Sequence, residues 1–256
     1  MFSRLTVMKV VLEVTCKWIL QHGNELPWRE FLNNRTVTIP YLPANPEIDI
    51  LKSIAILTER CGAVPICHVP ASRFKNELHL QNFIDTIKKN GVESILALGG
   101  EGKLNGVLSN ASQVLDVADN QFKSVGIAAY PEGHKLISDP VLEEALSKKL
   151  DKLRKVKKPF VVTQLALDPR VINNWLGRFK KHDVSIFIGV IGPNNPQSVA
   201  RLAHRLGFGA SKLNIEEQYH PQRMMDELDL GSFDGFQIST FDNMESTRNW
   251  IEKSKY

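Results

Sequence analysis

The sequence is poor in cysteine and in long apolar runs. Its 256 residues include three cysteines, Cys16, Cys61 and Cys67, and no two of them have zinc-finger spacing. An odd number of scattered cysteines is typical of free thiols in a reducing compartment. No apolar run approaches the roughly 20 residues that a transmembrane helix needs. We therefore expect no membrane partner and no metal, and a cytoplasmic location ahead of a mitochondrial one, which the basic start MFSRLTVMK leaves open.

The sequence also has little excess of one charge over the other. The net charge is +4, and no arm of consecutive basic residues carries it. The densest basic run is KKLDKLRKVKK at 148–158, which favours a solvated helix face over a nucleic-acid or phosphate-binding patch. We predict no nucleic-acid partner, and we leave a homo-oligomer open. Hydrophobic residues make up 43% and charged residues 23%, as in a soluble globular protein.

Short β-branched runs alternate with helix-length amphipathic segments along the whole chain. Most of the runs are continuously apolar, which indicates strands of a parallel sheet covered on both faces. The eight expected strands are 9–14, 36–41, 63–69, 93–100, 124–130, 159–167, 184–192 and 234–240.

Helix signals lie between these strands. We expect helices at 45–62, with Asn45 as N-cap and Pro46 in first position, at 76–91, with Asn76 as N-cap, and at 168–182, with Asp168 as N-cap. Two more helices are expected at 195–207 and 242–255. Residues 16–34 are less regular, and residues 208–233 indicate a helical excursion before the last strand. Eight such units predict one (β/α)₈ TIM-type barrel over residues 1–256. An open doubly wound sheet is the alternative, and the lack of a glycine-rich dinucleotide turn weighs against it.

Polar side chains gather where the apolar strands end. Chemistry in a (β/α)₈ barrel takes place at the C-terminal ends of the strands. Reading those ends gives Glu13, Thr15, Thr38, Tyr41, His68, Gly99, Gly100, Glu101, Tyr130, Glu132, His134, Thr163, Gln164, Gly192, Asn194, Gln237 and Thr240. Packing alone does not explain a set that converges on one mouth.

Three of these residues are costly to bury. Glu13 is either paired with a cation or at a sheet edge, or it is a carboxylic acid with a raised pKa that donates a proton. His68 is either a satisfied core histidine or a ligand contact. The Gln164 amide needs a partner for both its oxygen and its nitrogen, either a neighbouring strand or a heterocycle with adjacent donor and acceptor.

Two motifs resemble the methylenetetrahydrofolate reductase family. AAYPEGH at 128–134 is similar to the turn that ends the fifth strand of that family, and VTQLALD at 162–168 to its sixth strand. LEVT at 12–15, ICHV at 66–69, ILALGGE at 95–101 and the segment 234–251 match its other strands in family order. The resemblance covers the compact catalytic barrel.

The resemblance implies roles for these residues. Glu13 would be the general acid that protonates the bridging nitrogen of 5,10-methylenetetrahydrofolate, and a hydride from NAD(P)H would reduce the methylene carbon to a methyl group. Glu101 and Gln164 would bind the folate substrate. The residues that would hold the cofactor are His68, Gly99, Gly100, Tyr130, His134 and Lys149, with Lys148 as an alternative to Lys149.

Departures from the family concern the flavin. Gly99 stands where the family has arginine, Glu101 where it has aspartate, and Ala145 where it has asparagine. These changes remove charge-assisted contacts to a flavin nucleotide. Some short members with a Gly-Gly turn work without flavin, so we expect FAD to bind weakly or not at all. The other interpretations are a catalytically degenerate barrel that binds folate or partners an active paralogue, and an enzyme acting on a different one-carbon carrier.

Overall fold

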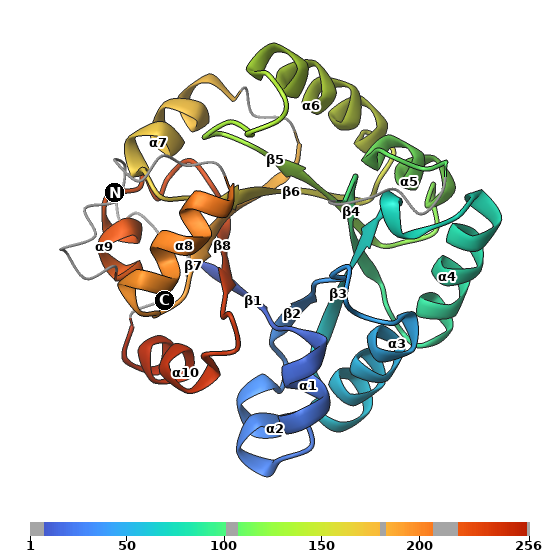
Figure 1. Ribbon diagram of the computed structural model, residues 1–256, viewed down its shortest axis with the longest axis horizontal. Coiled ribbons are helices and arrows are strands. Elements are labelled where there is room, and N and C mark those ends of the chain that lie inside the picture. The colour runs from blue at the N-terminus through green and yellow to red at the C-terminus, as the bar shows by residue number, and fades with distance from the viewer. Residues whose placement is uncertain (1–7, 101–106, 180–182, 207–219, 255–256) are drawn as a thin grey trace, which may run out of the picture.

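A computed structural model describes residues 8–100, 107–179, 183–206 and 220–254. Within these residues eight parallel strands close into a barrel in chain order, each paired with its neighbours and β1 with β8 (Figure 1). The strands are β1 Lys9–Glu13, β2 Thr36–Ile39, β3 Val64–Pro70, β4 Ser94–Leu98, β5 Ser124–Ala129, β6 Lys158–Leu165, β7 Ser185–Ile191 and β8 Gly235–Ser239. The predicted (β/α)₈ barrel is confirmed.

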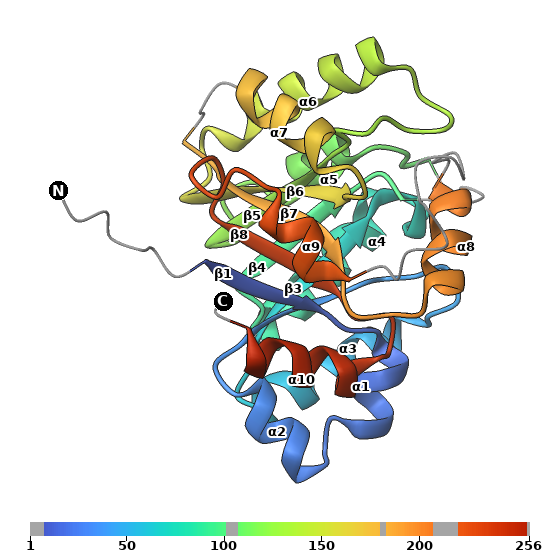
Figure 2. The same ribbon diagram turned by 90° about the vertical axis from the view of Figure 1, so that its left-hand side faces the viewer.

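Helices surround the strands (Figures 1 and 2). Two short helices follow β1 and one extra helix precedes β8. Part of the predicted 208–233 excursion, residues 208–219, lies outside the described residues. The helices are α1 Cys16–His22, α2 Leu26–Leu32, α3 Glu47–Ala55, α4 Glu77–Lys89, α5 Ala111–Val117, α6 Asp139–Leu153, α7 Pro169–Arg178, α8 Pro196–Leu206, α9 Pro221–Asp226 and α10 Met244–Lys253. A π-helical turn, Ile56–Arg60, continues α3, and a 3₁₀ turn, Ala71–Arg73, follows β3.

Two of the three predicted N-caps are confirmed. The Asn76 side chain accepts a hydrogen bond from the His79 backbone N–H, and Asp168 accepts one from Arg170. The prediction for Asn45 is wrong, because Pro46 itself occupies the extended N-cap position of α3 and offers no side-chain hydrogen bond. Asn45 therefore lies one residue too early to cap the helix.

The barrel interior is filled by apolar side chains that point inward from alternate strand positions. Val11, Ile66, Leu96, Phe160 and Val162 form one buried cluster. Gly126 makes room for it, since a Cβ there would lie 2.2 Å from the Phe160 ring. A larger cluster fills the space between the strands and the helices.

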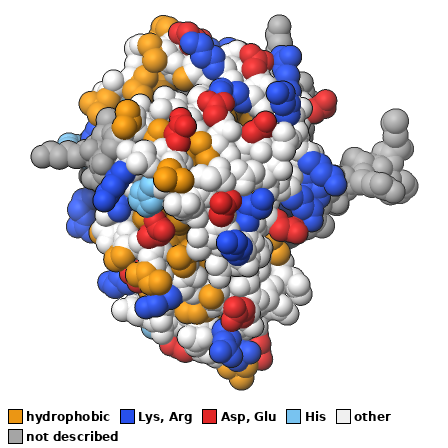
Figure 3. All heavy atoms as spheres, turned by 90° about the vertical axis from the view of Figure 1, so that its right-hand side faces the viewer, with side chains coloured by type: hydrophobic (Ala, Val, Ile, Leu, Met, Phe, Trp, Pro, Cys, Tyr) orange, Lys and Arg blue, Asp and Glu red, His pale blue; other side chains and the backbone are white. Residues whose placement is uncertain are grey.

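The outer wall carries charges of both signs. Figure 3 shows Lys and Arg side chains interspersed with Asp and Glu on the side that holds α3 and α4, with single hydrophobic side chains between them. Ile48 of α3 and Leu78 of α4 are among the exposed ones. No helix in the described part of the chain is long and apolar enough to cross a membrane.

Candidate active site

Glu13 ends β1 with its carboxylate in the barrel mouth, held by two side chains of β8. The Ser239 hydroxyl donates to Oε1 at 2.8 Å, and the Gln237 amide Nε2 donates to Oε2 at 3.1 Å. The strand register produces this contact, because Glu13 and Ser239 are direct partners across the β1–β8 pairing. Within the described ranges no lysine or arginine pairs with Glu13, and His68 is the one basic side chain near it.

Burial raises the pKa of the Glu13 carboxyl above its usual value, and the Ser239 hydrogen bond only partly opposes this effect. The side chain keeps 22% of its surface exposed, so a ligand in the mouth can reach it. A carboxyl that a ligand can reach, and that keeps its proton to a higher pH than an ordinary glutamate does, is suited to general acid catalysis.

His68, on β3, faces the same carboxyl. Its Nε2 lies 3.8 Å from Glu13 Oε2, and its side chain is 9% exposed. Burial lowers the pKa of His68 to about 4, so the ring is neutral at physiological pH. The described residues offer Nε2 no hydrogen-bond partner. A neutral ring leaves the pKa of Glu13 raised, whereas an imidazolium at this distance would lower it.

Gln164 lies near the end of β6, beside an irregularity in the strand pairing. The register between β6 and β7 shifts between Val162 and Leu165, and the Thr163 hydroxyl accepts a hydrogen bond from the Gly189 backbone N–H. A side chain at Gly189 would meet the Thr163 carbonyl oxygen at 2.6 Å, so this close approach requires glycine. The Gln164 Oε1 is buried and has no partner in the described structure. A ligand that donates a hydrogen bond would satisfy it.

The Tyr130–His134 turn follows β5. The two rings are 5.4 Å apart and nearly perpendicular, and Gly133 adopts a left-handed conformation with φ of +85°. Glu132 braces the turn, because its Oε1 accepts hydrogen bonds from the backbone N–H groups of Leu167 and Asp168, at 2.6 and 2.9 Å. The β5 and β6 loops are thus held together at the mouth.

Replacing Glu132 tests this brace. We expect Glu132→Ala to lower the free energy of unfolding by about 1–3 kcal/mol, because two backbone donors lose their charged acceptor. Glu132→Gln keeps an acceptor oxygen, so it should lower the free energy of unfolding by less. Urea denaturation of both variants measures the difference, and equal losses would show that the hydrogen bonds carry no part of the effect.

The other predicted cofactor residues lie in different settings. Gly99 and Gly100 follow β4, and Gly100 has φ of +90° and lies so close to Ser72 that a Cβ would meet its Oγ at 2.1 Å. Lys149, on α6, donates to the Ala128 carbonyl oxygen at 2.8 Å, and burial lowers its pKa to about 8. The ammonium is thus engaged with the end of β5. Glu101 lies outside the described residues.

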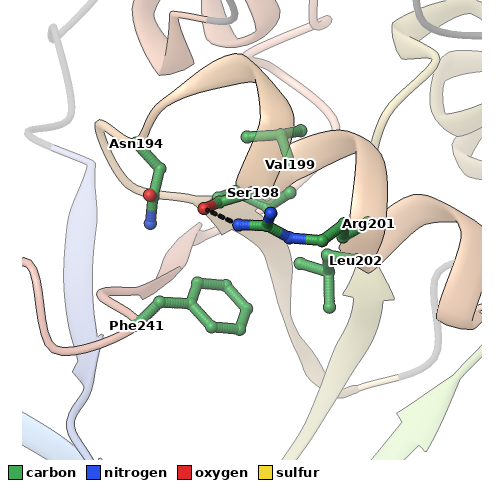
Figure 4. A pocket seen from close by; sticks show the side chains of 7 residues that line it. Asn194, Ser198, Val199, Arg201, Leu202 and Phe241 are labelled. Atoms are coloured by element: carbon green, nitrogen blue, oxygen red, sulfur yellow. Dashed lines mark hydrogen bonds between the residues drawn. The ribbon is translucent and has the colours of Figure 1, made fainter.

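A groove of about 400 Å³ opens between the end of β7 and α8. Figure 4 shows the Phe241 ring on one side of it, with Asn194, Ser198 and Arg201 along the α8 side. Arg201 donates to the Ser198 hydroxyl at 3.0 Å. Ile191 of β7 also lines the groove and pairs with Ser239 of β8, which in turn pairs with Glu13 of β1, so one strand separates this edge of the groove from the acid.

Phe241 and Asp242 both have positive φ, 48° and 64°. A non-glycine residue rarely adopts this conformation, and an aromatic one there is strained. A hydrogen bond from the Thr15 hydroxyl to Asp242 Oδ1, 2.6 Å long, fixes the turn. Phe241 lines the groove and is 40% exposed. The motifs in the sequence point neither to Phe241 nor to Ser239 as a site residue.

A closed barrel with these groups at the C-terminal mouth belongs to the (β/α)₈ barrels whose sites lie at that end. A sequence model of the methylenetetrahydrofolate reductase family matches residues 47–229, most of the chain. The chain belongs to this family. The matched range contains the loops after β4, β5 and β6, and the fold adds Glu13 and Ser239 from outside it.

Solved structures share the fold. The chain is similar to a phosphonopyruvate hydrolase (9% identity, TM-score 0.53, covering 96% of this chain and 80% of that one). It is also similar to an N-acetylneuraminate lyase from Mycoplasma synoviae (10% identity, TM-score 0.52, 97% and 74%). A putative phosphonomutase from Burkholderia cenocepacia J2315 has 8% identity and a TM-score of 0.50 (95% and 90%). At these identities the likeness concerns the barrel alone.

Proposed function

We propose that the protein reduces 5,10-methylenetetrahydrofolate to 5-methyltetrahydrofolate with NAD(P)H. The observation that carries this proposal is the Glu13 carboxyl, which has a raised pKa and is held at the mouth of a barrel of this family by Ser239 and Gln237. The direct test is folate-dependent oxidation of NAD(P)H by the purified protein, measured with and without added FAD. Oxidation that is independent of the folate would contradict it.

Glu13 supplies the proton. The substrate holds its reactive carbon between N5 and N10 in a five-membered ring. Proton transfer from the Glu13 carboxyl to N10 allows the bond between N10 and the methylene carbon to break, which leaves an iminium at N5. Ser239 and Gln237 hold the carboxylate that remains. Their two hydrogen bonds fix the orientation of the acid before the substrate arrives.

Gln164 binds the pterin. The edge of the pterin presents donors and acceptors side by side, and the buried Gln164 Oε1 requires a donor. A carboxamide matches such an edge with one accepted and one donated hydrogen bond. These bonds position the ring so that its reacting end meets Glu13 across the mouth.

The tail of the folate extends into the groove beside α8. The aminobenzoyl ring stacks on Phe241, and Arg201 meets a carboxylate of the glutamate. The aromatic ring of Phe241 and the guanidinium of Arg201 match the ring and the negative charge that the tail carries, which supports this part of the proposal.

The residues at the mouth fit a nicotinamide. The unpartnered Nε2 of His68 and the Tyr130–His134 ring pair offer a polar contact and an aromatic contact to such a ring. Bound NAD(P)H supplies the hydride that turns the methylene carbon into a methyl group, directly or through FAD. The engagement of Lys149 with the Ala128 carbonyl supports the direct route, since this lysine is the predicted phosphate contact for a flavin.

The pH dependence should follow Glu13 and not His68. Activity is expected to fall as pH rises through the raised pKa of Glu13, because only the protonated acid donates. His68 has a pKa of about 4, so it is already neutral at the pH values at which Glu13 loses its proton. We expect kcat/KM against pH to keep its alkaline limb in His68→Asn. Loss of the limb in that variant would assign it to the histidine instead.

A degenerate barrel that binds folate without reducing it is the second candidate. The absence of the family arginine at Gly99 and of the family asparagine at Ala145 favours it. A buried acid at the mouth counts against it, because a scaffold has no use for that cost. Folate binding without any NAD(P)H oxidation would select this candidate.

A further inference from the structure

A second cavity, of about 630 Å³, lies at the opposite end of the barrel from Glu13. Its lining includes the first residues of several strands, and β1 starts on the left in Figure 2. Its inner wall is apolar and consists of inward side chains of several strands, Val11, Ile66, Phe160, Val162 and Phe187. A concave apolar space of this size accommodates a small organic molecule.

The rim of this cavity is basic. Four cationic side chains line it, and Glu93 is its one carboxylate: the cations are Lys9, Arg35, Lys123 and Lys158. Glu93 pairs with Lys123 at 3.0 Å. Lys9 and Lys158 are exposed and have no ion-pair partner in the part of the chain that the structure describes. An apolar space beneath uncompensated cations favours a ligand with an anionic head and an apolar body.

Gln237 links this cavity to the catalytic mouth. Its side chain lines the cavity and is 6% exposed. Nε2 donates to Glu13 Oε2 at 3.1 Å, whereas Oε1 has no hydrogen-bond partner among the described residues. A buried carbonyl oxygen without a partner is costly, and a donor in the cavity would relieve that cost.

We propose that this cavity is a binding site for a small hydroxylated carboxylate that acts as an effector of the enzyme. The carboxylate lies between Lys9 and Lys158, the apolar body lies on Phe160 and Phe187, and the hydroxyl donates to Gln237 Oε1. Because the same amide holds Glu13, an occupied cavity fixes the orientation of Gln237 and thereby changes the setting of the acid. The proposed binding depends only on the cavity and its lining, whereas the proposed effect on the rate rests on the proposed function.

The binding is tested by calorimetry on the full chain with 4-hydroxybenzoate as the probe. We expect one molecule to bind per chain, and benzoate, which lacks the hydroxyl, to bind about five- to tenfold more weakly. The double variant Lys9→Gln/Lys158→Gln should weaken binding at least about tenfold, whereas Lys52→Gln on α3 should leave it unchanged. No binding at a probe concentration of roughly 10 mM, or equal affinity in wild type and double variant, would overturn the site.

The link to Glu13 is tested by turnover. Saturating 4-hydroxybenzoate should change kcat in wild type and in Lys52→Gln, and should leave the double variant, which is expected to keep its basal rate, unaffected at the same concentration. Binding with no change in rate would overturn the link through Gln237. If no variant turns over the folate at all, the proposed function fails, while calorimetry still decides whether the site exists.

Discussion

Glu13→Gln should reduce kcat by about 10²–10⁴-fold, the range over which a positioned general acid contributes. The amide has no proton to give to N10, so the five-membered ring of the substrate stays closed. Folate binding should be almost unchanged, because Gln164 and the groove beside α8 are untouched. Stopped-flow or steady-state NAD(P)H oxidation measures the rate, and fluorescence titration with a folate measures binding.

The substitution is expected to leave the fold intact. Ser239 can still donate to the oxygen of the introduced amide, and Gln237 can turn its unpartnered Oε1 towards the new N–H₂ group. The raised pKa of Glu13 means that its ionisation costs stability as pH rises through that pKa, so the neutral variant should unfold at the same or a higher temperature at alkaline pH. Glu30→Gln on α2, an exposed position, is the matched control. Near-full turnover by Glu13→Gln would contradict the assignment of the acid.

Gln164→Ala should raise KM for the folate by about 10–100-fold, because two hydrogen bonds to the pterin edge are lost, each contributing about 0.5–1.5 kcal/mol. The loss concerns binding in both the ground state and the transition state, so kcat should fall less than kcat/KM. Initial rates across a range of folate concentrations separate the two parameters.

Gln81→Ala, on the outer helix α4, is the control for this change. It removes an amide of the same size that bonds to Asp85 far from the mouth, and its kinetics should match those of the wild type. An unchanged KM in Gln164→Ala would show that the amide serves the β6 strand and not the pterin. A fall in kcat alone would place its effect in the transition state.

The barrel was predictable because its strands are continuous apolar runs. The observed strands agree with the predicted ones to within about two residues at each end, as for β5, Ser124–Ala129 against 124–130. Helix starts followed from capping residues at Asn76 and Asp168. The prediction that Asn45 caps α3 failed, because a shift of one residue in the helix start decides which side chain can reach the first turn.

The surroundings of Glu13 were less accessible to sequence reasoning. Ser239 lies 226 positions from Glu13, and only the closure of β8 onto β1 brings them together. The alternation of Gln237 and Ser239 along one strand face was the available signal. The strained turn at Phe241 left no signal, because nothing in the chain marks a phenylalanine that adopts a positive φ. The structure also assigns Glu132 to a backbone brace and places His68 against the acid.

Product analysis decides whether the protein reduces 5,10-methylenetetrahydrofolate with Glu13 as the acid. Purified protein is incubated with 5,10-methylenetetrahydrofolate and NAD(P)H, without added flavin, and the folates are separated by chromatography. We expect 5-methyltetrahydrofolate to form in step with NAD(P)H oxidation in the wild type and in Glu30→Gln, and to be nearly absent in Glu13→Gln. Equal product from Glu13→Gln and wild type would show that Glu13 is not the acid, and no product from a folded wild type even with FAD supplied would show that the protein is not this reductase.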